Sequence, residues 1–215
     1  MKKLITEKDL IELEKKGNKV VIIDNQTIVT PLALDRIRSS KLSVVQKDIA
    51  TIKPETELKG NERLQTNHII IGSDHTGFRL KNNLIKYLSE KGFDLFDTGT
   101  FDENSCDYPD IAKIVSTRVA SGEFGFGILI DATGIPSAIV ANKFAGIRAA
   151  TCYNAFSARS SRAHNNSNVL VLGSKSLGEE TIKIIVDEWI TTKFEAGRHQ
   201  KRLDKLGDIE RENFR

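Results

Sequence analysis

The 215-residue chain has few cysteines and no long apolar run, and each lack excludes a class of protein. Its two cysteines, Cys106 and Cys152, cannot form a disulfide framework, which favours a reducing, cytoplasmic setting. Apolar runs such as Val20–Ile23 are far too short to cross a bilayer, and the N-terminus lacks the apolar region of a secretory signal. We therefore expect no membrane association.

The usual signatures of nucleotide, metal and nucleic-acid binding are also missing. No GxGxxG follows an expected strand, and the GxxxxGKS/T phosphate loop does not occur. The four histidines and two cysteines lack zinc-ligand spacing, so neither a metal nor another cofactor is expected. Residues 1–65 hold 13 basic and 10 acidic residues, and the remainder holds 19 of each. This mixture is not the basic stripe that binds nucleic acid.

A polar stretch at residues 46–66 divides the chain into two parts of unequal size. Residues 1–45 are expected to form a small α/β extension, and residues 67–215 the main domain. In the extension, Thr6 and Asp9 resemble a capping box that opens a helix to about Lys16. Further expected elements are strands at Lys19–Asp24 and Leu42–Val45 and a helix from Thr30-Pro31 to about Arg38. About 45 residues are marginal for independent folding.

The main domain alternates short β-rich runs with helical patterns. The expected strands are Ile69–Ile71, Asp94–Asp97, Gly127–Ile130, Ile147–Ala150 and Val169–Leu172. The expected helices are Phe78–Lys91, Ile111–Ser121, Ile135–Asn142, Ala155–Asn165 and Gly178–Thr191. This alternation predicts an α/β fold with a parallel sheet covered on both faces. Such sheets bind ligands beyond the carboxyl ends of their strands.

Two of these strand ends carry candidate chemistry. Asp74 and His75 follow the first strand, where an anion could bind at a helix N-terminus, although an Asp N-cap beside an incidental His explains them equally well. Asp131–Pro136 follows the third strand. Its small residues expose N–H groups that could hold an oxyanion, and Asp131 could serve as a base. The alternative is a tight strand–helix turn capped by Asp131.

Two further groups come later in the chain. His164 and Asn165 end a helix, where His could be a general acid or Asn could simply cap the helix. Arg198 and Arg202 lie four residues apart and could share a helix face that binds phosphate, or form a solvated basic turn. An acid, a base, an N–H cradle and an anion clamp together are what an aldose–ketose phosphate isomerase needs.

From about His68 to Ile209 the chain resembles the ribose-5-phosphate isomerase B and galactose-6-phosphate isomerase family. The segments that carry the resemblance are Gly72–Phe78, Ser105–Asp110, Ala141–Ala150, Arg162–Leu170 and Phe194–Arg202. The resemblance implies a doubly wound, Rossmann-like five-stranded parallel sheet and metal-free catalysis. It also implies a homodimer or homotetramer with sites shared between subunits.

The resemblance further implies a role for each matching residue. Asp74 and Tyr108 would position the sugar, His75 would help to bind its phosphate, and His164 with Asn165 would open the ring and hold the substrate. Arg198 and Arg202 would grip the phosphate. Backbone groups of the loop after the third strand would stabilise a cis-enediolate; its residues are Ala132, Thr133, Gly134, Ile135 and Pro136.

The chain departs from the family pattern at the base. Ribose-5-phosphate isomerases of this type carry a Cys at the Asp131 position or a Glu at the Ser137 position, and this chain has neither. Asp131-Ala132 instead resembles the galactose-6-phosphate isomerase A subunit. Ala132 and Pro136 also replace glycines of the cradle, and Pro136 has no N–H to donate. We hypothesise that Asp131 is the base, as a carboxylate is in other isomerases.

The first 45 residues resemble the N-terminal segment of some ethanolamine-utilisation proteins of bacterial microcompartments. The similar stretches are Lys2–Glu7 and Thr27–Pro31. This similarity suggests docking to a microcompartment shell or cargo partner, and a stabilising extension is the alternative. For the whole chain, the expected activity is interconversion of ribose 5-phosphate and ribulose 5-phosphate. A hexose-6-phosphate isomerase subunit and a non-catalytic sugar-phosphate-binding protein are the alternatives.

Overall fold

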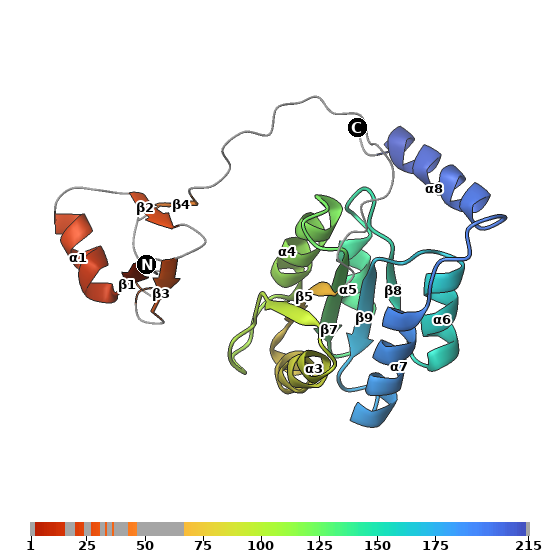
Figure 1. Ribbon diagram of the computed structural model, residues 1–215, viewed down its shortest axis with the longest axis horizontal. Coiled ribbons are helices and arrows are strands. Elements are labelled where there is room, and N and C mark those ends of the chain that lie inside the picture. Colours follow the sequence, from red (N-terminus) through yellow and green to blue (C-terminus); the bar gives the residue numbers. More distant parts are fainter. Residues whose placement is uncertain are drawn as a thin grey trace. The chain divides into compact units, whose positions relative to one another are not determined.

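The chain divides into two units, residues 1–60 and 61–215, and each is described by itself (Figure 1). In the computed structural model the described residues are 3–15, 20–23, 27–30, 33, 36, 43–46 and 67–213. The division falls within the expected linker, of which residues 47–66 lie outside the described residues. Of the helix expected from Thr30-Pro31, only Ala33 and Arg36 are described as helical.

The first unit contains one helix and two pairs of short parallel strands. The strands are β1 (Lys3–Ile5), which pairs with β3 (Thr27–Val29), and β2 (Val20–Ile23), which pairs with β4 (Ser43–Gln46). The helix α1 spans Glu7–Lys15. Thr6 donates from its N–H and its Oγ1 to Asp9 Oδ2, at 2.8 and 2.6 Å, which confirms the predicted cap. The sequence patterns did not predict β1 and β3.

The second unit is built on a five-stranded parallel sheet with the order β6-β5-β7-β9-β8. Its strands are β5 (His68–Ser73), β6 (Asp94–Asp97), β7 (Phe126–Asp131), β8 (Ala149–Thr151) and β9 (Val169–Gly173). All five strands predicted from the sequence are present. The three central strands, β5, β7 and β9, are buried almost throughout, as expected for a parallel sheet covered on both faces.

Helices cover both faces of this sheet (Figure 1). They are α3 (Phe78–Glu90), α4 (Tyr108–Ala120), α5 (Ile135–Ala141), α6 (Ala155–Ala163) and α7 (Glu179–Thr191). Alternating strand residues supply two cores, because successive side chains point to opposite faces. Ile71 and Ile128 pack with α3, α6 and α7, where Trp189 is fully buried, and Ile70 and Leu129 pack with α4 and α5. The doubly wound fold is confirmed.

The strand order places a topological switch point between β5 and β7. From β5 the chain crosses to β6 on one side, and it then returns to β7 on the other side. Ser73 pairs with Ile130, so the carboxyl ends of these two strands lie side by side. A crevice at such a point is where open α/β sheets bind ligands. None of the described helices is both long and apolar enough to span a bilayer.

A last helix, α8 (Gln200–Asn213), was not predicted. None of its residues is buried. Its apolar residues Leu203, Leu206 and Ile209 line a pocket of about 460 Å³ that also includes Ala149 and Ala150 of the edge strand β8. This helix therefore adds little to the core of its own unit.

Candidate active site

Asp74 and His75 leave β5 at the switch point. The Asp74 Oδ1 atom accepts from the N–H of Thr76 at 2.9 Å, the N–H of Gly77 at 3.2 Å and Thr76 Oγ1 at 2.6 Å. Asp74 thus caps the short 3₁₀ helix η1 (His75–Gly77), which is the structural alternative that the sequence left open. Gly77 is required there, because a Cβ would lie 2.7 Å from a methyl carbon of Ile130 on β7.

The loop after β6 fixes the ring of His75. The N–H of Cys106 donates to His75 Nδ1 at 3.4 Å, so in this contact Nδ1 is the acceptor. The half-buried imidazole then carries its proton on Nε2 when it is neutral. His75 is therefore set up to donate a hydrogen bond from Nε2 to an anion.

A buried ion pair holds this loop against α3. Lys81 is fully buried, and its Nζ lies 2.5 Å from Asp97 Oδ2 and 5.6 Å from the centroid of the Phe101 ring. Asp97 Oδ1 accepts from the N–H of Gly99 at 2.9 Å. A buried ammonium needs such a partner, because an unpaired charge is costly away from water. The pair ties the site-lining loop to the main body.

Asp131 ends β7 with only 1% of its surface exposed. Its Oδ1 accepts from the N–H groups of Thr133 at 2.8 Å and Gly134 at 2.6 Å, and its Oδ2 accepts from that of Ser137 at 3.0 Å. Gly134 adopts φ +82°, and a Cβ there would lie 2.8 Å from Thr151 Cγ2. The loop is therefore folded around the carboxylate.

Several N–H groups of the predicted enediolate cradle already have acceptors in this arrangement. The N–H groups of Thr133 and Gly134 donate to Asp131, and that of Ile135 donates to Thr133 Oγ1 at 3.2 Å. Pro136 has no N–H. The Asp131 carboxylate lies two and three residues before Thr133 and Gly134 and is the nearest acceptor for their N–H groups. These N–H groups are therefore already bonded when a substrate arrives. The loop therefore orients a carboxylate, and the N–H groups of Thr133, Gly134 and Ile135 are bonded within the loop.

Other groups at this edge were missed by the sequence analysis. The hydroxyls of Ser73 and Ser174 are buried without a hydrogen-bond partner among the described residues. Ser174 and Lys175 donate their N–H groups to the carbonyls of Asp131 and Ala132, at 2.8 and 3.0 Å. Unpartnered buried hydroxyls and an adjacent cation are suited to a polar ligand. Short side chains after strand ends give little sequence signal, which is why they escaped notice.

Tyr108 lies at the start of α4, with Asp107 as its N-cap and Pro109 next to it. Its side chain is half-buried, and the described residues offer its hydroxyl no hydrogen bond. A second tyrosine, Tyr153, donates its hydroxyl to the carbonyl of Thr133 at 3.1 Å. The edge around Asp131 therefore contains two tyrosines, of which the sequence analysis named one.

The second predicted group lies at the opposite edge of the sheet. Helix α6 begins beyond the carboxyl end of β8 and runs back, so His164 and Asn165 follow it at the amino edge. There the carbonyl of Asn168 accepts from the N–H of Gly127, at the start of β7. Asp131 ends that same strand, which spans six residues, or roughly 20 Å. Within one chain the structure does not bring His164 and Asp131 together.

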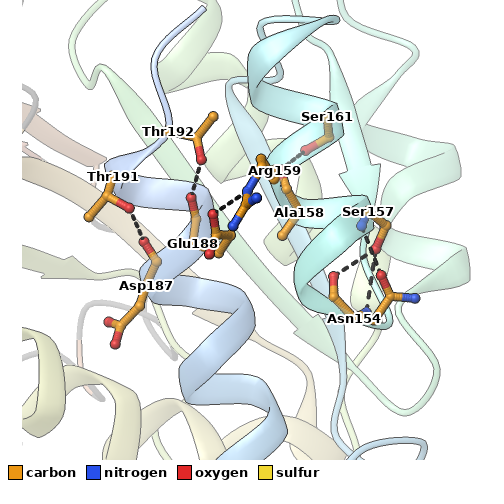
Figure 2. Close-up of polar contacts among 9 residues, drawn as sticks. All are labelled: Asn154, Ser157, Ala158, Arg159, Ser161, Asp187, Glu188, Thr191 and Thr192. Atoms are coloured by element: carbon orange, nitrogen blue, oxygen red, sulfur yellow. Dashed lines mark hydrogen bonds and ion pairs between the residues drawn. The ribbon is translucent and has the colours of Figure 1, made fainter.

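Helices α6 and α7 lie side by side and are linked by a polar contact (Figure 2). The Arg159 Nε atom donates to Glu188 Oε1 at 2.6 Å across the two helices. Asn154 and Ser157 form a complete capping box at the start of α6. The chain after α7 then returns to the end of α6, where the N–H of Glu195 donates to the carbonyl of Ala163 at 3.0 Å.

His164 forms a stacked pair with His199. The ring centroids are 4.2 Å apart and the planes differ by 9°. His164 Nδ1 lies 3.1 Å from Ser160 Oγ, and Glu195 Oε2 lies 3.8 Å from the Nε2 atoms of both rings. Burial lowers the pKa of His199, as do the neighbouring charges of His164, Arg198 and Arg202, whereas Glu195 raises it.

This cluster has the composition of a metal site but poor geometry for one. Ligand atoms of His164, Glu195 and His199 lie within 4.8 Å of one another. Metal–imidazole bonds of about 2.0–2.1 Å need the in-plane lone pairs to converge. Parallel stacked rings direct these lone pairs side by side, and Arg198 Nε already donates to His199 Nε2 at 3.3 Å. The arrangement is better suited to holding a proton.

Arg198 and Arg202 do not share one helix face as predicted, because Arg198 precedes α8 in a turn and Arg202 lies within that helix. Both are exposed. His199 occupies the Nε atom of Arg198, which leaves the two terminal nitrogens of that guanidinium for an anion. The tight turn explains the difference: Ala196 and Gly197 both adopt φ +54° immediately before Arg198.

A buried arginine, Arg162, and a half-buried one, Arg148, support the turn that carries His164 and Asn165. Arg162 Nη1 donates to the carbonyl of Ser167 at 2.6 Å, and Arg148 Nε donates to the carbonyl of Asn166 at 2.9 Å. Burial and the nearby charge of Arg148 lower the pKa of Arg162 to about 10. Asn166 adopts φ +46°, the left-handed conformation expected of Asn after a helix.

The fold and the site define a doubly wound α/β protein with titratable side chains at both edges of its sheet. The family described as Ribose/Galactose Isomerase matches residues 69–206, and the chain belongs to that family. It is 46% identical over 142 residues to ribose-5-phosphate isomerase B of Escherichia coli strain K12, covering 66% of this chain and 95% of that protein.

Solved structures agree with this assignment. Ribose-5-phosphate isomerase B of Clostridium thermocellum is 44% identical, with a TM-score of 0.67, covering 67% of this chain and 98% of that one. The Mycoplasma genitalium enzyme with bound ribulose-5-phosphate is 38% identical, with a TM-score of 0.66, covering 68% of this chain and 97% of that one. The family match begins at residue 69, so the first unit lies outside it.

Proposed function

We propose that the chain is an aldose–ketose isomerase that interconverts ribose 5-phosphate and ribulose 5-phosphate through a cis-enediolate. The observation that carries the proposal is the buried Asp131 carboxylate, which is held rigidly at the switch point beside Asp74 and His75. The similarity to ribose-5-phosphate isomerases B supports the choice of sugar.

Asp131 is the proposed base. An ionised carboxylate can accept about four hydrogen bonds. Two N–H groups occupy Oδ1 and one occupies Oδ2, which leaves one site on Oδ2 to carry a proton between C2 and C1 of the sugar. The three N–H donors hold this oxygen in place, as a base that acts within hydrogen-bond reach requires.

The remaining roles are divided between the two edges. At the carboxyl edge, Asp74 and Tyr108 position the sugar, and His75 donates to the phosphate. The unpartnered hydroxyls of Ser73 and Ser174 are suited to contact the enediolate oxygens in place of the occupied cradle. At the amino edge, His164 protonates the ring oxygen, Asn165 holds the sugar, and Arg198 and Arg202 bind the phosphate.

A complete site then needs two copies of the chain, so we propose a homodimer or homotetramer with shared sites. Within one chain the carboxyl-edge and amino-edge residues are separated by the length of β7, roughly 20 Å. This is too far for them to hold one pentose phosphate between them. Exposed apolar side chains next to the carboxyl edge are suited to contact the second copy. They are Ile135 (52% exposed), Ile139 (59%), Tyr153 (42%) and Phe156 (80%).

The first test is turnover of ribose 5-phosphate by the purified protein, followed as ribulose 5-phosphate. We expect Asp131→Asn to abolish turnover while the variant still binds the substrate, because the amide cannot accept the proton. Asp102→Asn is the matched control, since Asp102 makes a similar local turn in an exposed loop. Undiminished turnover in Asp131→Asn would reject Asp131 as the base. An inactive wild type would reject the isomerase itself.

For the first unit we propose docking to a bacterial microcompartment shell or cargo protein, with the enzyme either cytoplasmic or enclosed. The match to the relatives described above falls in the second unit and covers 95–98% of their length. The first unit is therefore available for another role. Removal of residues 1–60 should leave turnover unchanged and abolish co-sedimentation with shells. Retained co-sedimentation would contradict docking through this unit.

A further inference from the structure

We propose that Glu195 is a positioning residue for His164, holding a proton on His164 Nε2 so that this histidine can open the sugar ring. The inference rests on the proposed function, because it concerns the ring-opening acid of that reaction. Glu195 lies in the turn after α7, and a backbone hydrogen bond fixes its position. The N–H of Glu195 donates to the carbonyl of Ala163, the residue immediately before His164.

The contacts around the two stacked rings differ, and the difference decides which ring carries the proton. A carboxylate only accepts hydrogen bonds, so Glu195 Oε2, which lies 3.8 Å from the Nε2 atoms of both rings, favours a proton on whichever of them has no other donor. Ser160 Oγ, 3.1 Å from Nδ1, can accept from the opposite nitrogen, so His164 keeps a proton on Nδ1 after Nε2 has given up its own. A guanidinium only donates, so Arg198 Nε makes His199 Nε2 an acceptor.

Burial reinforces this assignment. His199 is 4% exposed, whereas the His164 side chain is 41% exposed and can reach a substrate. Two protonated rings stacked 4.2 Å apart would repel each other, next to Arg198 and Arg202. The lowered pKa of His199 favours its neutral form, so this ring serves as a flat support. The more exposed His164 is the ring placed to give its Nε2 proton to the sugar ring oxygen and to take one back as the C1 hydroxyl becomes the aldehyde.

The test separates ring opening from the isomerisation chemistry. Ribose 5-phosphate is mainly cyclic, whereas ribulose 5-phosphate cannot close a furanose ring because its O5 is esterified. Exchange of the C1 protons of ribulose 5-phosphate in D₂O thus needs the base and the phosphate site but no ring-opening acid.

We expect Glu195→Gln to lower kcat for ribose 5-phosphate by about ten- to a hundredfold. The KM and the C1 exchange rate should change less than about twofold.

Glu195→Asp should recover part of the lost turnover, and Glu180→Gln is the matched charge control on an exposed helix face. Equal losses of turnover and of C1 exchange in Glu195→Gln would mean general damage to the site and would overturn the inference, as would no loss of turnover. An inactive wild type would instead remove the proposed function, on which the inference rests.

A second measurement does not depend on turnover. In ¹H–¹⁵N spectra of the full chain with labelled histidine, Glu195→Gln should shift the His164 Nε2 resonance toward the unprotonated value and leave His75 unchanged. An unchanged His164 resonance would overturn the inference even in an active enzyme.

Discussion

At the scale of single residues, Asp131 has two separable consequences, one for chemistry and one for stability. Its carboxylate satisfies three buried N–H groups, those of Thr133, Gly134 and Ser137. A buried donor left without a partner costs roughly 1–3 kcal/mol. Asp131→Ala should therefore lower the free energy of unfolding by about 3 kcal/mol, since the three donors share one cavity.

Urea denaturation measures this loss. Asp102 offers the matched comparison, because it accepts from the N–H of Asn104 at 2.9 Å in an exposed loop, where water can replace it. Asp102→Ala should cost less than about 1 kcal/mol. Equal losses in the two variants would mean that the Asp131 contacts stabilise the fold no more than an exposed turn does.

His199 makes stability depend on pH. Its pKa in the folded state is lowered by burial and by the nearby His164, Arg198 and Arg202, whereas in the unfolded chain it is about 6.5. Below that pH the unfolded chain binds a proton that the folded protein resists, so stability falls as the pH falls and is regained on return above about 6.5. Urea midpoints measured from pH 5 to 8 should show this decline, and His199→Gln should flatten it. Parallel curves for the two proteins would contradict it.

At the scale of elements, the turn between α7 and α8 is strained at one residue. Ala196 adopts φ +54°, a left-handed conformation that costs an L-residue about 1 kcal/mol and glycine almost nothing. Ala196→Gly should therefore stabilise the protein slightly, by up to about 1 kcal/mol, in thermal or urea unfolding. Ala145→Gly, at an exposed turn residue without positive φ, should instead destabilise it. A loss of stability in Ala196→Gly would mean that its methyl group makes contacts worth more than the strain.

Most elements of the second unit could be predicted from the sequence, because the periodic spacing of apolar residues and the turn residues at strand ends are strong indicators of secondary structure. The five strands were found on their β-rich runs, and α3 to α7 followed from helical spacing. Helix α8 was missed, because its sequence contains Gly207, a poor helix former, and its few apolar residues do not enter the core. In the first unit β1 and β3 were missed, since three-residue strands are too short to show a period.

The residues of the proposed site were named from the sequence, but their arrangement could not be. Spacing alone does not tell whether the N–H groups after β7 face a substrate or the side chain of Asp131, because both need the same turn. Nor does it show that His164 and Asp131 occupy opposite edges of the sheet. That follows only once α6 is seen to run antiparallel to β7. Glu195 was overlooked because its role depends on a turn that brings it back to the end of α6.

At the scale of the whole molecule, the distance between the carboxyl-edge and amino-edge residues bears on how many chains one proposed site needs. The carboxyl edge holds the proposed base, Asp131, and the amino edge holds the proposed acid and the phosphate clamp. If two copies meet so that unlike edges face each other, a dimer contains two composite sites, each with one edge from each chain. A defect at either edge then inactivates both sites of a homodimer but only one site of a suitable hybrid.

Mixing two inactive variants therefore tests the assembly. Asp131→Asn and Arg198→Gln proteins, unfolded together and refolded, should regain about a quarter of wild-type turnover, since half the dimers are hybrids with one intact site of two. Asp131→Asn mixed with a His75→Asn variant provides the matched control, because both changes lie at the carboxyl edge and every composite site stays defective. Ribose 5-phosphate turnover measures the recovery. Recovery in both mixtures would mean that the regained turnover does not depend on which edge is changed. Recovery in neither would place a complete site within one chain.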